Sequence, residues 1–136
     1  MNLDNNDRKI RLGHIALVCS SEQRAEDFYR GVLGLRRIKS FLLPKHLTRQ
    51  VFGIDRECRV LVYGNDRFTA EIFLAMRTPG MNTGFEHICI EVEDIGKFIK
   101  RCKAMRVEVN RVPKEDRLLT FVKDYDGNLF EIKESK

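Results

Sequence analysis

The chain has 136 residues, which is the length of one globular domain or of two half-size units that share a core. At 43% hydrophobic and 33% charged it is too apolar for a disordered protein, and no apolar run is long enough for a transmembrane helix. The basic residues lack the aromatic motif of an RNA-binding sheet, which argues against a nucleic-acid partner. The net charge of +5 fits a small anionic substrate instead. We therefore expect neither a nucleic-acid nor a membrane partner.

The N-terminal residues and the cysteines bear on the compartment. Residues 1–9 are polar and contain no apolar core, so they are not a secretory signal, and we expect residues 1–10 to form a flexible arm. The four cysteines include no CxxC pair, which favours reduced thiols in a cytoplasmic protein. Three of them lie in apolar patterns and should be buried, whereas Cys89 shares a strand face with His87.

The first half of the chain predicts a strand, a helix and three further strands. Residues 13–20 alternate as a strand does, and the helix that follows should be capped by Ser20 and stop at Gly34. Residues 45–56 are ambiguous between a loop, a helical turn and a strand edge, and we expect His46 to be an exposed loop histidine. The other strands of this half are predicted at 36–43, 57–63 and 68–76.

The second half repeats this order. After a strand at 84–93, Asp94 should cap a helix, and Pro113 should end the next strand at 107–112. Two more strands are predicted at 117–123 and 128–133, joined by a tight turn over 124–127. We therefore predict a single domain over residues 11–136, with module 1 at about 11–76, a connector at 77–83 and module 2 at about 84–134.

Each half places a histidine on its first strand and a glutamate in the middle of its last strand. These residues are His14 and Glu71 in the first half, and His87 and Glu131 in the second. All four have the parity opposite to the helix-packing residues, so they could line one concave surface if the two half-sheets face each other. A lone strand histidine is more often a core residue, and a mid-strand glutamate is more often solvated, but the repeat makes coincidence the weaker explanation. Two imidazoles and two carboxylates suit one divalent ion such as nickel, cobalt, manganese, iron or zinc.

Several motifs resemble those of the glyoxalase, or vicinal oxygen chelate, superfamily. The opening strand is Gly13-His14-Ile15-Ala16-Leu17-Val18, and the first helix carries Phe28-Tyr29 followed by Leu33-Gly34-Leu35. Module 2 starts with Glu86-His87-Ile88, and the chain closes with Asp124-Tyr125-Asp126-Gly127-Asn128 followed by Glu131. Tyr125 stands where the family usually has proline. The resemblance covers roughly residues 11–134 and is specific to the superfamily but not to one reaction.

The resemblance implies an α+β fold in which two βαβββ modules form a cupped mixed sheet around one metal site, and it implies a homodimer. The family's metal ligands map onto His14, Glu71, His87 and Glu131. The reaction implied is that of a glyoxalase I-like lyase or isomerase, a proton transfer next to a metal-bound carbonyl of a small substrate, with Glu131 or Glu71 as the base. Predicted pocket walls, which plain sheet packing would also explain, are Phe73, Cys89, Leu119 and Phe121.

Two other functions stay open. A three-ligand site of His14, His87 and Glu131 would resemble an extradiol dioxygenase or a fosfomycin-type thiol transferase, and loss of the metal would leave a resistance-type binding protein. Glu71 favours the glyoxalase I-like pattern, because epimerases of the superfamily typically have glutamine there. Val18 and Ala75 stand where glutathione-using bacterial glyoxalases carry arginine and asparagine, which argues against glutathione as the co-substrate.

Overall fold

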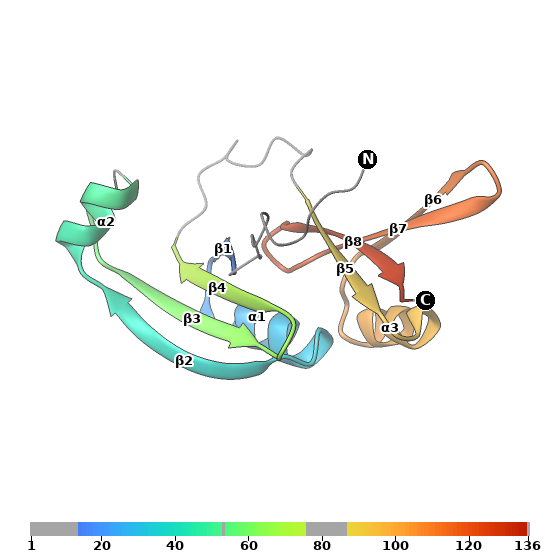
Figure 1. The fold of residues 1–136 in the computed structure, drawn as a ribbon, viewed down its shortest axis with the longest axis horizontal. Helices are drawn as coiled ribbons and strands as arrows, with labels where there is room; N and C mark the ends of the chain where they lie inside the picture. Colours follow the sequence, from blue (N-terminus) through green and yellow to red (C-terminus); the bar gives the residue numbers. More distant parts are fainter. Residues whose placement is uncertain (1–13, 53, 76–86, 136) are drawn as a thin grey trace, which may run out of the picture.

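The computed structural model describes residues 14–52, 54–75 and 87–135, which form two four-stranded sheets (Figure 1). The first sheet has the order β1-β4-β3-β2, and the second has the equivalent order β5-β8-β7-β6. In both sheets the first and last strands of the module pair in parallel, and the other neighbours are antiparallel. The predicted α+β fold of two βαβββ modules is thereby confirmed.

The strands follow the predicted ranges closely. Those of module 1 are β1 (Ile15–Cys19), β2 (Arg36–Leu43), β3 (Cys58–Gly64) and β4 (Thr69–Leu74). Those of module 2 are β5 (Ile88–Val92), β6 (Val109–Lys114), β7 (Arg117–Lys123) and β8 (Leu129–Glu134). The predicted arm at 1–10 and the connector at 77–83 lie outside the described residues.

The first helix begins one residue later than predicted. It consists of α1 (Glu22–Ala25) and the π-helical segment η1 (Glu26–Val32). Ser21 is the cap, because its hydroxyl accepts a hydrogen bond from the backbone N–H of Arg24 at 3.2 Å. Ser20 accepts instead from the Arg24 guanidinium, so the prediction of Ser20 as the cap was wrong. Gly34 ends the helix as predicted, with a φ of 71°.

Two further predictions need correction. Pro113 lies inside β6 and does not end it, because β6 is the edge strand of its sheet and has no partner on one side for the missing N–H. The ambiguous stretch 45–56 contains the helix α2 (Lys45–Phe52), which starts directly after Pro44. It connects β2 to β3 at the end of these two strands that is remote from the first helix (Figure 1). His46 is therefore exposed, as expected, but on a helix.

The second helix, α3 (Ile95–Ala104), agrees with its prediction. The Asp94 carboxylate caps it by accepting from the backbone N–H of Lys97 at 3.0 Å. Phe98 and Cys102 are the buried residues of this helix, four positions apart on one face. No helix among the described residues is long and apolar enough to cross a membrane.

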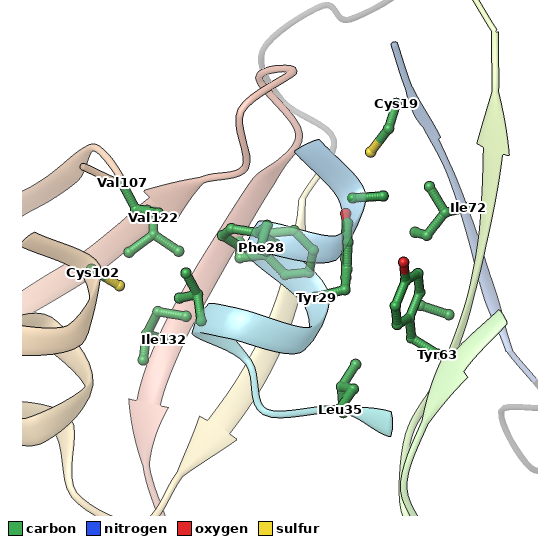
Figure 2. Close-up of a cluster of buried hydrophobic side chains, with 14 of the residues drawn as sticks. Cys19, Phe28, Tyr29, Leu35, Tyr63, Ile72, Cys102, Val107, Val122 and Ile132 are labelled. Atoms are coloured by element: carbon green, nitrogen blue, oxygen red, sulfur yellow. The ribbon is translucent and has the colours of Figure 1, made fainter. Parts of the chain in front are cut away.

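One hydrophobic core joins the two modules, and the first helix lies between the two sheets (Figure 2). Phe28 points to the second sheet, with its ring 5.6 Å from that of Phe130, while Tyr29 stacks on Tyr63 of the first sheet at 5.8 Å. Ile72 on β4 and the matching Ile132 on β8 are both buried in this core. Because side chains alternate along a strand, the neighbours of these residues project from the outer faces of the two sheets.

Candidate functional site

The first predicted pair, His14 and Glu71, comes together at the edge of the first sheet. β1 runs parallel to β4 with Ala16 opposite Glu71, so His14 stands two residues before the strand partner of that glutamate. Nε2 of His14 lies 3.5 Å from Oε1 of Glu71. The imidazole side chain is 49% exposed and the carboxylate side chain 23%, which leaves both accessible to a ligand.

The second pair, His87 and Glu131, repeats this arrangement in module 2. Cys89 on β5 stands opposite Glu131 on β8, so His87 again precedes the strand partner of the glutamate by two residues. The distance between Nε2 and Oε1 is 3.7 Å, and the side chains are 41% and 17% exposed. The ring of Phe121 lies 5.9 Å from that of His87. Each module therefore builds the same two-residue half-site at the same position of its sheet.

The four residues do not meet within one chain. Among the described residues, no group of three or more His, Cys, Asp or Glu side chains is close enough to hold an ion. The reason is the shared core: Ile72 and Ile132 point inward, so Glu71 and Glu131, one residue away on each strand, point outward from different sheets. Within the described part of one chain, the four side chains therefore do not line the single concave surface predicted from the sequence.

Each half-site by itself fits a shared cation. Two ligand atoms that bind one ion at about 2.1 Å stand roughly 3.0 to 3.4 Å apart. The two histidine–glutamate separations, 3.5 Å and 3.7 Å, are close to that spacing and are longer than a good hydrogen bond. Imidazole nitrogen and carboxylate oxygen are ligands that zinc, nickel, cobalt, manganese and iron accept. One half-site supplies only two of the ligands that such an ion needs.

The predicted pocket walls lie on the same outer faces. Cys89 and Phe121 stand on the two strand neighbours of Glu131, each opposite it in register, and Leu119 precedes Phe121 by two residues on β7. Phe73 lies on the strand of Glu71 itself, two residues further along β4 and therefore on the same face. Partial burial, together with the nearby Glu131 carboxylate, raises the pKa of the exposed Cys89 thiol, which makes it a weaker nucleophile at neutral pH. The other three cysteines are buried, as expected.

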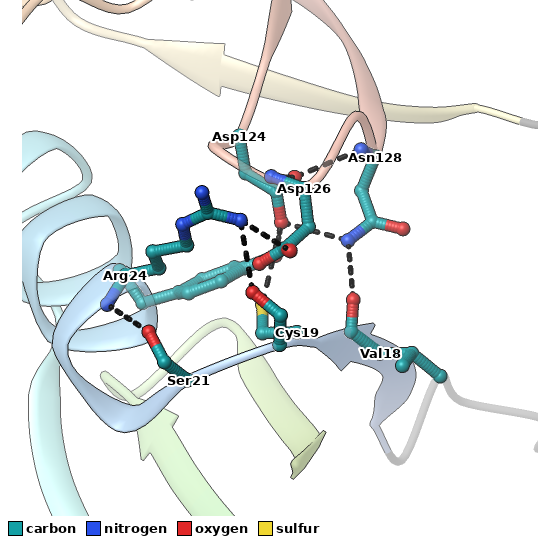
Figure 3. A network of polar contacts seen from close by, with 9 residues as sticks. Val18, Cys19, Ser21, Arg24, Asp124, Asp126 and Asn128 are labelled. Atoms are coloured by element: carbon teal, nitrogen blue, oxygen red, sulfur yellow. Dashed lines mark hydrogen bonds and ion pairs between the residues drawn. The ribbon is translucent and has the colours of Figure 1, made fainter. Parts of the chain in front are cut away.

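A buried hydrogen-bond network, which the sequence indicated only as a turn, ties the two modules together (Figure 3). The carboxylate of Asp124 accepts from the hydroxyl of Tyr29 at 2.9 Å and from the side-chain amide of Asn128 at 2.7 Å. It also accepts from two backbone N–H groups of its own turn, those of Asp126 and Asn128. The Asn128 amide donates in addition to the carbonyl of Val18 on β1 at 3.0 Å.

This network sets the position of one half-site relative to the other. Val18 belongs to the strand that follows His14, and Asn128 directly precedes the strand that carries Glu131. Burial and the neighbouring Asp124 carboxylate raise the pKa of the Tyr29 hydroxyl, so Tyr29 stays a donor. The signal in the sequence was the run of two aspartates and an asparagine within one turn, whose carboxylate and amide groups need partners when they are buried.

The chain belongs to a known superfamily. Residues 11–132 match the model of the Glyoxalase/Bleomycin resistance protein/Dioxygenase superfamily, which covers most of the chain. The chain is therefore a member of that superfamily, as its motifs indicated.

Curated relatives have several activities. The chain is 35% identical over 104 residues to an iron-dependent extradiol dioxygenase of Rhodococcus jostii (strain RHA1), covering 73% of this chain and 33% of the relative. It is 28% identical over 100 residues to the mitochondrial methylmalonyl-CoA epimerase of Homo sapiens, covering 71% of this chain and 54% of the relative. The chain thus spans about a third of the dioxygenase and about half of the epimerase.

Solved structures show the same fold. The fosfomycin resistance protein FosX from Mesorhizobium loti superposes with a TM-score of 0.68 at 14% identity, covering 93% of this chain and 92% of that one. A glyoxalase family protein from Enterococcus faecalis gives 0.68 at 21% identity, with 90% and 95% covered. The FosX of Listeria monocytogenes, crystallised with Mn(II) and sulfate, gives 0.68 at 18% identity, with 93% of each chain covered.

Proposed function

We propose that the protein is a metal-dependent, glyoxalase I-like lyase or isomerase that moves a proton next to a carbonyl of a small substrate. The observation that carries this proposal is the repeated half-site, with His14 and Glu71 in one module and His87 and Glu131 in the other. Glu71 stands in the same register relative to His14, and at a similar distance from it, as Glu131 does relative to His87. This repeat would be unexplained if Glu71 took no part in metal binding. The repeat therefore supports four ligands and not three.

Each residue has a defined task in this proposal. His14 and His87 serve as neutral ligands through Nε2, the atom that faces the glutamate in each pair. When bound, the divalent ion would polarise the substrate carbonyl and make the adjacent C–H more acidic. Glu131 or Glu71 accepts that proton on Oε1 and returns it to the product. Phe121, next to His87, shields this side of the site from water.

The complete site would form between two copies of the chain. The shared core turns the two half-sites outward on different sheets, so neither can reach the other around the first helix. A symmetric homodimer would bring module 1 of one copy against module 2 of its partner and so generate two equivalent sites. We also propose that the protein is cytoplasmic, since all four of its cysteines are free thiols.

A second candidate function is a ring-cleaving dioxygenase with His14, His87 and Glu131 as ligands. The relative that favours it is the extradiol dioxygenase of Rhodococcus jostii, with 35% identity over the matched region. In that case Glu71 would be dispensable for metal binding. The role of Glu71 therefore separates the two functions.

The test is the metal content of the purified protein by elemental analysis. Glu71→Gln and Glu131→Gln would be compared with the wild type and with Glu91→Gln, a control that removes an exposed carboxylate from β5. We expect about one ion per chain in the wild type and the control, and clearly less in both half-site variants. A loss in Glu131→Gln alone would support the three-ligand dioxygenase. No bound ion after addition of nickel, cobalt, manganese, iron or zinc would refute metal-dependent catalysis.

The reaction itself is tested by proton exchange. The metal-loaded protein would be incubated in D₂O with 2-oxoaldehyde thiol adducts or acyl-CoA epimers, and deuterium next to the carbonyl would be measured by NMR. Exchange that depends on Glu131 supports the proposed proton transfer. Oxygen uptake on a catechol by the iron-loaded protein, without exchange on any of these substrates, would favour the dioxygenase instead.

A further inference from the structure

A bulge in β2 turns one lysine toward the outer face of the first sheet. The register of β2 against β3 shifts between Arg37, which stands opposite Tyr63, and Lys39, which stands opposite Val62. Without the shift, Lys39 would stand opposite Leu61 and point to the helix-covered side of the sheet. Bulges are frequent beside active sites because they redirect a side chain in this way.

Lys39 then shares a cross-strand row with the half-site glutamate. Lys39 pairs with Val62, and Val62 pairs with Glu71, so the three side chains project from the same face. Two strand spacings separate the first and last of them, which is roughly 10 Å. Ile38, the other bulge residue, is 54% exposed, and its side chain is near the position that a Cβ on Gly64 would occupy on this face. The strand register therefore fixes the backbone distance between Lys39 and Glu71, and an exposed apolar side chain precedes Lys39 in the bulge.

Lys39 differs from the basic residues around it because it has no carboxylate partner among the described residues. Arg37 pairs with Glu22, and both Lys45 and Arg49 pair with Asp55. The ammonium of Lys39 lies instead 5.6 Å from the centroid of the Phe41 ring. Residues 36–59 contain seven basic and two acidic residues, a formal charge of +5 that equals that of the whole chain. The net positive charge of the protein is thus concentrated in residues 36–59, the segment that carries Lys39.

We propose that Lys39 binds an anionic group at the far end of the substrate and thereby selects the substrate class. This inference rests on the proposed metal site at His14 and Glu71. The substrate would have vicinal oxygens at one end, an apolar spacer that contacts Ile38, and a carboxylate or similar anion at the other end. A lysine ammonium that has no carboxylate partner in the described part of the chain attracts such an anion, and the strand register sets the length of the spacer.

The test compares two hydroxamates that differ only at the far end of the chain. Suberic monohydroxamic acid ends in a carboxylate and octanohydroxamic acid in a methyl group, and both present the same metal-chelating head. Their affinities for the cobalt-loaded protein would be measured by calorimetry for the wild type, Lys39→Met, Lys39→Arg and the control Lys45→Met. We expect the wild type to prefer the carboxylate compound about tenfold, which corresponds to about 1.4 kcal/mol.

Lys39→Met should lose this preference while still binding octanohydroxamic acid, and Lys39→Arg and Lys45→Met should keep it. A wild type without the preference, or a Lys39→Met variant that retains it, would overturn the assignment of Lys39 while leaving the metal site intact. A cobalt-loaded protein that binds neither hydroxamate would overturn the role of Lys39 in substrate binding, whereas a protein that takes up no cobalt would refute the metal site itself.

Discussion

Replacing Asp124 by alanine should destabilise the protein strongly, because this carboxylate is only 5% exposed and holds the two modules together. The substitution leaves five donors without their acceptor: the Tyr29 hydroxyl, the Cys19 thiol, the Asn128 amide and the backbone N–H groups of Asp126 and Asn128. Each buried donor that loses its partner costs about 1–3 kcal/mol, although water entering the space left by the carboxylate recovers part of this. We expect a total loss of about 3–5 kcal/mol, a large part of the stability of a typical domain.

The assay is urea unfolding followed by circular dichroism, in which the midpoint should fall while the m-value stays unchanged. Asp124→Asn keeps one carbonyl oxygen and the shape of the side chain, so it should lose less, about 1–2 kcal/mol. Asp116→Ala, which removes an exposed carboxylate at another turn, serves as the control and should stay within about 0.5 kcal/mol of the wild type. A loss below about 1 kcal/mol for Asp124→Ala would refute the view that this network joins the modules.

Three smaller predictions follow from single contacts. Gly34→Ala should lose about 1 kcal/mol in urea unfolding, because φ is 71° there, and an unchanged midpoint would contradict that cause. Tyr125→Phe removes the hydroxyl that donates to the Met105 carbonyl at 2.6 Å, so it should lose about 0.5–1.5 kcal/mol; a more stable variant would argue against this bond. Burial raises the pKa of Cys102 from 9.0 to about 11, so its contribution to stability is full below pH 9 and is lost as the pH rises toward 11. The fall in unfolding free energy over that range should be less steep in Cys102→Ala, and an identical pH profile would contradict it.

The strand faces and most element boundaries could be predicted because they follow from the alternation of apolar and polar residues along the chain. Ile72 is buried and Glu71 is not, as the parity of β4 required. Asp94 was recognisable as a cap because its carboxylate accepts from a backbone N–H three residues ahead in its own sequence. Features of this kind depend on residues that are close together in the sequence, so they can be predicted from the sequence alone.

The errors arose where distant residues decide the outcome. Ser20 and Ser21 are equivalent as caps by local pattern, but Ser20 accepts from the Arg24 guanidinium, which is held there by its ion pair with the distant Asp126. Pro113 could remain in a strand only because β6 is an edge, which depends on the order of the sheet. In the same way, the two histidine–glutamate pairs could be found from the repeat, but the outward direction of both half-sites follows from the core that the modules share around Phe28.

The claim that two copies of the chain complete each metal site is tested most directly by combining two full-length variants, each of which lacks one ligand. A doubly tagged heterodimer of Glu71→Gln and Glu131→Gln would be purified, and its metal content measured by elemental analysis. In a shared site, the intact module 1 of one chain meets the intact module 2 of the other, so the heterodimer should hold about half the metal of the wild-type dimer. Each variant alone should hold little. A heterodimer that holds no more metal than either variant alone would show that the four residues do not combine across two chains.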